Sequence, residues 1–280
     1  MKTETVLITG ATGFLGRRLS KAFLTKGYKV IGTGHSESGI KEFERLFNND
    51  IQIFQVDIGG DGDYTVITNI LKKFPVDYIV HAAALKHVGI CENNPSRAVD
   101  VNVVGSQKLI RAAINRDIKN MIAISTDKSV KPLCVYGMTK KLMEEMFLEH
   151  DFGVFQGVNF LFSTGSVLDI WDKLRLEEKP ILVNTKAKRY FCLIDEVCDK
   201  IIGSIDLREI FSVNECYNIS ISDLQKAFST YHDYWNVDEF TPLDVEKHEE
   251  DLLLENINIL HPDTDTVTKL LCEHYRNHQV

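Results

Sequence analysis

The sequence lacks a long apolar run and an excess of positive charge. No stretch approaches the roughly 18 uninterrupted apolar residues of a membrane-spanning helix. The net charge is −8, from 32 basic and 40 acidic residues, so the chain as a whole does not attract nucleic acid. The opening residues MKTETVLITG lead into a strand pattern without the regions of a signal peptide. We therefore expect a cytoplasmic protein that binds neither membrane nor nucleic acid.

Closely spaced cysteine pairs are also absent. The six cysteines are scattered through the chain without a CxxC pair. A chain of 280 residues does not depend on a disulfide framework, because it can bury a substantial core. The sequence therefore predicts reduced thiols and no metal site.

Alternating strand-like and helix-like patterns fill the first 160 residues. Apolar runs of strand length occur at 5–9, 28–32, 51–56, 77–83, 121–126 and 153–161, with helical periodicity between them. This βαβ repetition predicts an α/β fold, a Rossmann-type doubly wound parallel sheet with helices on both faces.

A glycine-rich segment, TGATGFLG, follows the first predicted strand and opens the first predicted helix. Its glycines would let backbone N–H groups and the helix N-terminus face a pyrophosphate. The spacing is GxxGxxG, and a purely structural turn is the alternative, but the position at the first strand of a βαβ run favours a dinucleotide site. The residues assigned to this loop are Gly10, Thr12, Gly13, Phe14, Leu15 and Gly16.

The end of the second predicted strand, VIGTGHSES, indicates which dinucleotide is bound. NAD sites usually carry an acid here for the ribose hydroxyls, whereas His35 and Ser36 precede the first acid, Glu37. The missing acid favours NADP, although the expected arginine is missing too and NAD stays possible. The alternative is that His35 and Ser36 merely begin a solvated helix. Asp57, followed by Ile58, fits an acceptor for the adenine amino group or a turn cap.

The pattern loosens after about residue 160. We expect residues 1–160 to form an NADP-binding Rossmann domain. Residues 161–280 would form a smaller C-terminal α/β substrate-binding region packed on it, because the sequence shows no linker. Helices are predicted at about 165–175 and 195–207, and Ser222 with Gln225 makes a capping-box pattern before another.

The segment STDKSVKPLCVYGMTK, residues 125–140, combines two pairs of proton-transfer groups. Tyr136 and Lys140 share one helix face, and a nearby ammonium lowers the pKa of a phenol so that it can remove a hydroxyl proton. A plain dehydrogenase does not need Asp127 and Lys128. Once C4 of a sugar is oxidised, Lys128, if neutralised by burial, would remove the acidified C5 proton. Asp127, if its pKa is raised, would protonate the departing C6 hydroxyl. The alternative is a loop-capping Asp127 and a solvated Lys128.

Five segments of the chain carry a family resemblance: TGATGFLG, HAAALKHVGICENNPSRAVDVNVVGSQKL, ISTDKSVKPLCVYGMTK, KRYFCLIDEV and, more weakly, VEKHEEDLL. They resemble the soluble, inverting UDP-N-acetylglucosamine 4,6-dehydratases of the polysaccharide-biosynthesis branch of extended short-chain dehydrogenases. General sugar epimerases do not normally follow HAAA with LKHV or carry a TDK triplet.

The resemblance implies roles for individual residues. Asp127, Lys128 and Tyr136 would be the catalytic trio, and Lys140 would hold the nicotinamide ribose. The residues that would line the cofactor or meet the substrate are Ala82, Lys86, Thr126, Asn159, Thr164, Arg189 and Glu246. The alternatives without a functional role are that Lys86 is a solvated loop residue, that Arg189 is a charged residue on a surface strand, and that Glu246 is an acid at the start of a helix.

The chain departs from the family pattern where the nucleotide would be held. Thr164 in STGSV replaces an arginine, VNF replaces GNV, and Val245 replaces a glycine. The resemblance still implies an NADP-dependent dehydratase that converts UDP-N-acetylglucosamine to a UDP-4-keto-6-deoxy sugar with inversion at C5, as a homo-oligomer. The alternatives are a dehydratase or epimerase on another nucleotide sugar, and a catalytically inactive dinucleotide-binding regulatory protein.

Overall fold

The computed structural model describes residues 3–239 and 257–278, which fall into two compact units. The first unit comprises residues 1–157 and 195–212, and the second comprises 158–194 and 213–280. The end of the first segment lies close to the boundary expected at residue 160. Residues 195–212, expected in the C-terminal region, belong instead to the first unit.

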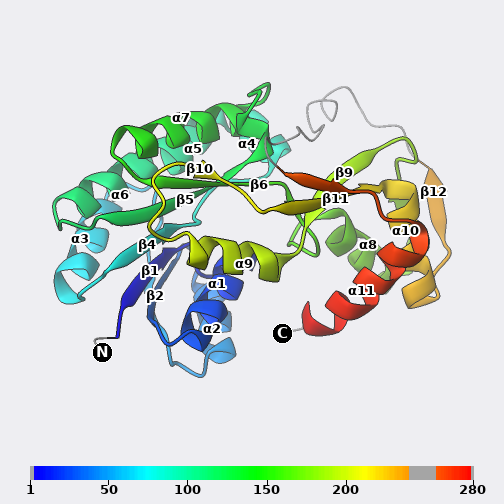
Figure 1. The fold of residues 1–280 in the computed structure, drawn as a ribbon, viewed down its shortest axis with the longest axis horizontal. Coiled ribbons are helices and arrows are strands. Elements are labelled where there is room, and N and C mark those ends of the chain that lie inside the picture. Colours follow the sequence, from blue (N-terminus) through cyan, green and yellow to red (C-terminus); the bar gives the residue numbers. More distant parts are fainter. Residues whose placement is uncertain (1–2, 240–256, 279–280) are drawn as a thin grey trace. The chain divides into compact units, whose positions relative to one another are not determined.

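The first unit is built on a parallel sheet of seven strands, ordered β10-β6-β5-β4-β1-β2-β3. Figure 1 shows helices on both faces of this sheet, with α3, α6 and α7 on one face and α1, α2 and α9 on the other. The predicted doubly wound parallel sheet is therefore confirmed. The strands are β1 Thr5–Thr9, β2 Lys29–Gly34, β3 Gln52–Gln55, β4 Tyr78–His81, β5 Asn120–Thr126, β6 Gly153–Gly157 and β10 Ile210–Phe211.

The central strands are apolar because helices cover them from both sides. All five residues of β1 are buried, and Ile79 and Val80 of β4 are fully buried. One core cluster joins these strands to α3, α6 and α7 through side chains such as Ile67, Leu109 and Phe147. The helices are α1 Phe14–Thr25, α2 Glu37–Leu46, α3 Asp63–Lys73, α4 Val88–Asn93, α5 Pro95–Val99, α6 Gly105–Ile114, α7 Val135–Glu149 and α9 Ile194–Gly203, with a π-helical turn η1 Asp100–Val104 and a 3₁₀ turn η2 Asp127–Ser129.

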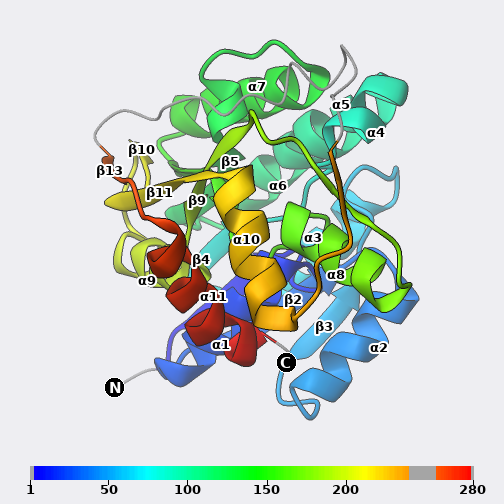
Figure 2. The same ribbon diagram turned by 90° about the vertical axis from the view of Figure 1, so that its right-hand side faces the viewer.

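The second unit contains a four-stranded sheet, ordered β13-β11-β9-β7, and a two-stranded sheet, β12-β8. Figure 2 shows α10 beside α11, and both helices contribute to a core that includes Trp171, Phe228 and Leu271. The Trp171 and Phe228 rings meet edge to face, with centroids 5.6 Å apart. The elements are β7 Asn159–Phe160, α8 Val167–Leu176, β8 Ile181–Val183, β9 Lys188–Cys192, β11 Glu215–Ser220, α10 Ile221–His232, β12 Val237–Glu239, β13 Asn258–Leu260 and α11 Thr264–His278.

Two local expectations differ from the structure. The apolar run at 153–161 is not one strand, because it divides at Val158 into β6 and β7, which belong to different sheets. The capping box expected at Ser222 is wrong. Ser220 is the N-cap of α10, and its Oγ accepts a hydrogen bond from Asp223 N at 3.0 Å. Because β11 extends to Ser220, Ser222 already lies inside the helix.

Candidate active site

The glycine-rich loop between β1 and α1 forms a tight cradle. Gly10 has φ +69°, and a Cβ on it would lie 2.7 Å from Ala83 N, so a side chain would collide with backbone there. Gly13 N donates to Gly10 O at 3.0 Å, and Gly13 is the N-cap of α1 without a side-chain cap. A cradle that a Cβ would fill, at a helix N-terminus without a side-chain cap, fits the pyrophosphate of a dinucleotide.

The remaining loop residues pack beneath this cradle. A Cβ on Gly16 would overlap Gly10 O and Ala11, and the Leu15 side chain is buried. Thr12 is buried and fills the space beside Gly34 at the end of β2. Thr12 and Leu15 therefore present backbone groups, rather than extended side chains, to a ligand.

The end of β2 leads directly into α2. Ser36 Oγ accepts a hydrogen bond from Gly39 N at 3.3 Å and caps the helix, while His35 is exposed and its carbonyl accepts from Gln55. Ser36 therefore begins α2, as the alternative interpretation of this stretch expected. That the Ser36 hydroxyl and the His35 imidazole also contact a 2′-phosphate remains a prediction.

Sequence reasoning overlooked a cation near this end of β2. Arg17, on α1, donates from Nε to Thr12 O at 2.8 Å and pairs with Glu42 of α2 at 2.6 Å. Arg17 directly follows Gly16, the last glycine of the loop, and this position could have identified it from the sequence.

Asp57 follows β3 and is already held by a cation. Both of its carboxylate oxygens lie 2.6 Å from Arg97 Nη2, and Oδ1 accepts from Gly59 N at 3.3 Å. Asp57 therefore caps the turn after β3, as one of the two interpretations expected. Its contact with an adenine amino group remains a prediction. Ile58 is buried against Gly105.

Ala82 and Lys86 follow β4. Ala82 N donates to Thr9 O at 3.1 Å, which places Ala82 against the glycine loop. Lys86 is exposed in the segment before α4. Asn102 of η1 fixes this segment, since its side chain exchanges hydrogen bonds with Leu85 N and O at 2.8 and 3.0 Å and also donates to Thr139 of α7. Sequence reasoning did not single out Asn102, because its partners are distant in sequence.

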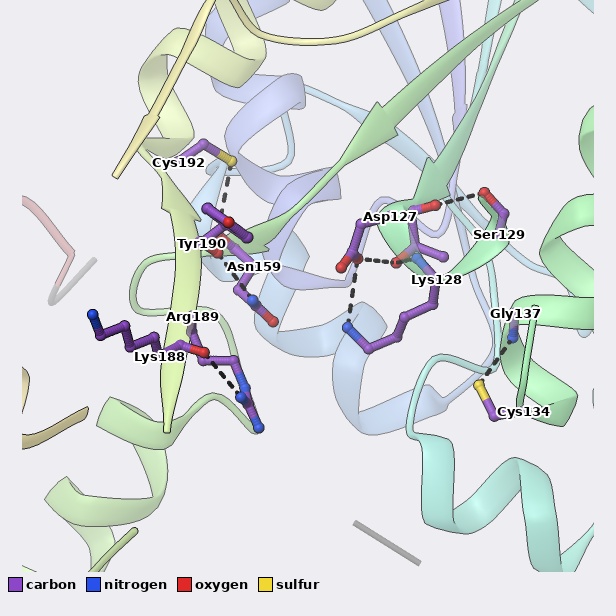
Figure 3. A network of polar contacts seen from close by, with 11 residues as sticks. Asp127, Lys128, Ser129, Cys134, Gly137, Asn159, Lys188, Arg189, Tyr190 and Cys192 are labelled. Carbon is purple, nitrogen blue, oxygen red and sulfur yellow. Dashed lines mark hydrogen bonds and ion pairs between the residues drawn. The ribbon is translucent and has the colours of Figure 1, made fainter. Parts of the chain in front are cut away.

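The catalytic segment brings Thr126, Asp127 and Lys128 together where β5 ends. Thr126 Oγ1 donates to Asp127 Oδ1 at 2.9 Å, and Lys128 Nζ lies 3.5 Å from the same oxygen. Figure 3 shows the Lys128 ammonium directed at this carboxylate. The side chains of Lys128 and Asp127 are only 13% and 2% exposed. Lys128 is therefore not solvated, which the alternative interpretation of this segment had required.

Tyr136, in the first turn of α7, belongs to the same cluster. Burial, followed by the Asp127 charge, raises the pKa of Tyr136, and the neighbouring Thr126 side chain acts in the opposite direction. The expected lowering by Lys140 is not what the structure shows, because Lys140 Nζ is directed instead to Met143 Sδ at 3.1 Å.

Lys140 is itself buried, with 2% exposure. Burial lowers the pKa of Lys140 to about 7, and the Glu144 carboxylate opposes this shift. A buried ammonium beside a thioether suits a polar ligand such as a ribose hydroxyl, so this residue also fits a dinucleotide.

The predicted substrate residues that the structure describes lie in the second unit, apart from Lys86 and Thr126. Asn159 of β7 donates to Tyr190 O at 3.0 Å, and Arg189 of β9 donates to Lys188 O at 3.0 Å (Figure 3). Because β7 pairs with β9, Asn159 and Arg189 lie on neighbouring strands. Thr164 is exposed in the loop before α8. Glu246 lies outside the described residues.

Within residues 3–239 and 257–278, no helix combines the length and apolar composition needed to cross a bilayer. The same residues contain no group of three or more His, Cys, Asp or Glu side chains arranged to hold a metal ion.

A family profile described as "Polysaccharide biosynthesis protein" matches residues 6–268. The chain belongs to this family. It is 30% identical over 243 residues to an inverting UDP-N-acetylglucosamine 4,6-dehydratase of Campylobacter jejuni, covering 81% of this chain and 71% of that protein. It is also 30% identical over 217 residues to a UDP-glucose 4-epimerase of Rickettsia bellii, covering 73% of this chain and 61% of the epimerase.

The fold is also similar to that of solved structures. The crystal structure of a dTDP-glucose 4,6-dehydratase of Streptomyces venezuelae, with NAD and TYD bound, superposes with a TM-score of 0.79 at 16% identity. The superposition covers 98% of each chain. The chain is thus similar in fold to that dehydratase.

The buried position of Lys140 predicts a pH-dependent stability. Its pKa is about 7 in the folded chain and 10.5 as the ordinary value, so between these values the unfolded chain binds a proton that the folded chain does not. The unfolding free energy of the wild type, minus that of Lys140→Met, should therefore rise with pH across this window, by up to about 1.4 kcal/mol per pH unit. Below pH 7 it should be constant. Urea unfolding as a function of pH measures the difference.

Lys141→Met is the matched control. Lys141 is 41% exposed and paired with Glu145 at 2.6 Å, and its pKa is raised, so both states stay protonated in the window. Its profile should be flat. A flat profile for Lys140→Met as well would mean that Lys140 keeps its ordinary pKa.

Proposed function

We propose that this protein is a nucleotide-sugar 4,6-dehydratase that converts UDP-N-acetylglucosamine to a UDP-4-keto-6-deoxy sugar with inversion at C5. The observation that carries the proposal is the contact of Thr126, Asp127 and Lys128 with one another, together with the action of the Asp127 charge on the pKa of Tyr136. An oxidation needs only the tyrosine, whereas an elimination needs a second base and an acid. The similarity to the Campylobacter enzyme supports the same reaction.

The residues present fit a nicotinamide dinucleotide. Gly10 and Gly13 would hold its pyrophosphate at the start of α1, and Lys140 would hold its ribose. Such a cofactor, when bound, would supply the hydride transfer by which C4 is oxidised and C6 is later reduced.

Tyr136 would take the proton of the C4 hydroxyl as C4 is oxidised. Burial and the Asp127 charge raise its pKa, and the Thr126 side chain acts in the opposite direction, toward the phenolate that this step requires.

Asp127 and Lys128 would carry out the elimination. This step needs Lys128 as a neutral amine and Asp127 as a protonated carboxyl. This neutral pair holds the same number of protons as the ion pair of Lys128 and Asp127. One proton moving from Lys128 Nζ to Asp127 Oδ1, across 3.5 Å, interconverts the two forms. Lys128 then removes the C5 proton and Asp127 protonates the departing C6 oxygen, which leaves as water. The pair is again an ion pair after this step. A proton from an exchangeable group then adds to C5 on the opposite face.

The resemblance predicts that Asn159 and Arg189 would hold the substrate nucleotide and that Lys86 and Thr126 would meet the sugar. Thr164 stands where the resembling enzymes carry an arginine, so the grip on the diphosphate would differ there.

An epimerase acting on a nucleotide sugar is the second candidate, favoured by the similarity to the Rickettsia enzyme. Mass spectrometry after incubation with NADP and a panel of UDP-sugars separates the candidates. A dehydratase gives a product lacking one water, and an epimerase gives an isomer of unchanged mass. Binding without any product would favour a regulatory protein and contradict both.

Oxidation and elimination should fail in different variants. Tyr136→Phe removes the phenolate, so oxidation at C4 should slow by roughly 10²–10⁴-fold, as is typical of a lost general acid or base. Lys128→Ala keeps Tyr136, so a 4-keto sugar that retains its C6 oxygen should form in one turnover and then persist. Quenched single-turnover reactions analysed by mass spectrometry distinguish the two products.

Isotope incorporation checks the assignment of Lys128 independently. In heavy water the wild type should place deuterium at C5 of its product, which is read by NMR. Deuterium-free product, or undiminished water loss in Lys128→Ala, would contradict the role of Lys128 as the C5 base.

The cofactor should be NADP rather than NAD. No acid precedes Glu37 at the end of β2, so the 2′-phosphate would meet His35 and Ser36 without a competing negative charge. Calorimetric titration should give tighter binding for NADP. Equal or reversed affinities would show that these two side chains only begin α2.

We also propose that the protein forms a homo-oligomer through α4, α5 and α7. Large apolar side chains are exposed on these helices: Ile90, Val99, Met138 and Leu142 are 42–54% exposed. Leu142→Lys should lower the mass measured by size-exclusion chromatography with light scattering. Ile114→Lys, at an equally exposed position on α6, should not. A monomeric wild type would contradict this assignment.

A further inference from the structure

Glu144 is a fully buried acid on the helix that carries Tyr136 and Lys140. It lies one turn beyond Lys140 and about two turns beyond Tyr136 on α7, so all three share one helix face. The reaction proposed above does not use this carboxylate. A buried carboxylate is costly unless it is hydrogen-bonded or paired, so its retention requires a reason.

The hydrogen bonds of Glu144 reach both ends of the catalytic segment. Glu144 Oε1 accepts from Ser125 Oγ and from Ser129 Oγ, each at 2.5 Å. Ser125 precedes Thr126, and Ser129 directly follows Lys128. Ser129 Oγ also lies 2.6 Å from Thr126 O. The carboxylate therefore clamps the ends of the three-residue stretch that carries the acid and the base of the elimination.

Gln156 connects the same carboxylate to β6. Its Nε2 donates to Glu144 Oε1 at 2.9 Å and to Ser129 Oγ at 3.2 Å. The network therefore joins β5, η2 and β6 to α7, so that one side chain links the segment of Asp127 and Lys128 to the helix of Tyr136.

The charge of Glu144 acts on Lys140. Burial lowers the pKa of Lys140, and the carboxylate raises it, so that Glu144 favours the ammonium form. Glu144 Oε2 makes no hydrogen bond within the described part of the chain, and Lys141 Nζ lies 3.8 Å from it. Among the described residues, His81 of β4 also interacts with Lys140. Burial, and after it the Lys140 charge, lowers the pKa of His81 to about 3, so it stays neutral near pH 7.

We propose that Glu144 is a positioning residue of the active site, which holds the Asp127–Lys128 segment against the helix that carries Tyr136. The proposal rests on the proposed function for the role of these groups. A merely structural carboxylate would support stability without affecting the rate per folded molecule or the titration of Lys140.

Glu144→Gln tests the proposal, because the amide keeps the shape and one acceptor but loses the charge. We expect kcat to fall by about 10- to 100-fold with KM nearly unchanged, since a small misplacement of catalytic groups can cost that much. Ser129→Ala removes a single arm of the clamp and should give a smaller fall in kcat. The matched control is Glu145→Gln, which neutralises the exposed neighbour and should leave kcat unchanged.

The titration of Lys140 supplies a second measurement that needs no substrate. In the Glu144→Gln background, the pH window in which Lys140→Met alters the unfolding free energy should begin lower, by on the order of one pH unit, because the group that raises the Lys140 pKa is gone. If the wild type converts no nucleotide sugar, the proposed function is contradicted. The unfolding measurement needs no substrate, so it still shows whether the Glu144 charge acts on Lys140. An unshifted window together with an unchanged kcat for folded Glu144→Gln would overturn the proposal.

Discussion

The close approach of Gly10 to the backbone at Ala82 and Ala83 is the contact on which the candidate site depends. It arises because β1 and β4 are adjacent and parallel, with Thr9 opposite His81, so that both chains leave the sheet at the same edge. The strand order reverses direction here, since β2 lies on one side of β1 and β4 on the other. Ligands of doubly wound sheets bind at such a switch point. β5 follows β4 in the sheet, and its end places the catalytic segment at the same edge.

Polar groups are buried at this edge at a cost to stability. Asp127, Lys140, Glu144 and His81 are each at most 2% exposed. Each has specific partners: the His81 ring, for example, lies within hydrogen-bonding distance of Thr9 Oγ1 at 2.7 Å and Ser106 Oγ at 2.9 Å. Satisfied networks of this kind fix side chains in one arrangement, which suits proton transfer better than a flexible surface would. At this edge of the sheet, buried polar and charged side chains therefore take the place of apolar packing.

The second unit carries the predicted nucleotide contacts, and its segments STGSV and VNF depart from the family pattern. Its backbone carbonyls engage both Asn159, through Tyr190, and Arg189, through Lys188. Thr164 occupies an exposed loop position where an arginine would otherwise supply a cation. The residues predicted to hold the nucleotide therefore depart from the family pattern, whereas the residues predicted to carry the chemistry match it.

The sequence by itself determined the parallel sheet, the glycine cradle and the grouping of Thr126, Asp127, Lys128 and Tyr136. These features depend on local periodicity, on close backbone approach and on residues within one turn or strand end of one another. It did not predict that 195–212 returns to the first unit, because β10 has only two residues and no pattern of its own. Nor did it reveal Glu144, Asn102 or the direction of the Tyr136 pKa shift. Those depend on burial and on partners such as Gln156 and Leu85 that only the packing of separate elements brings together, and burial is decided by the tertiary structure.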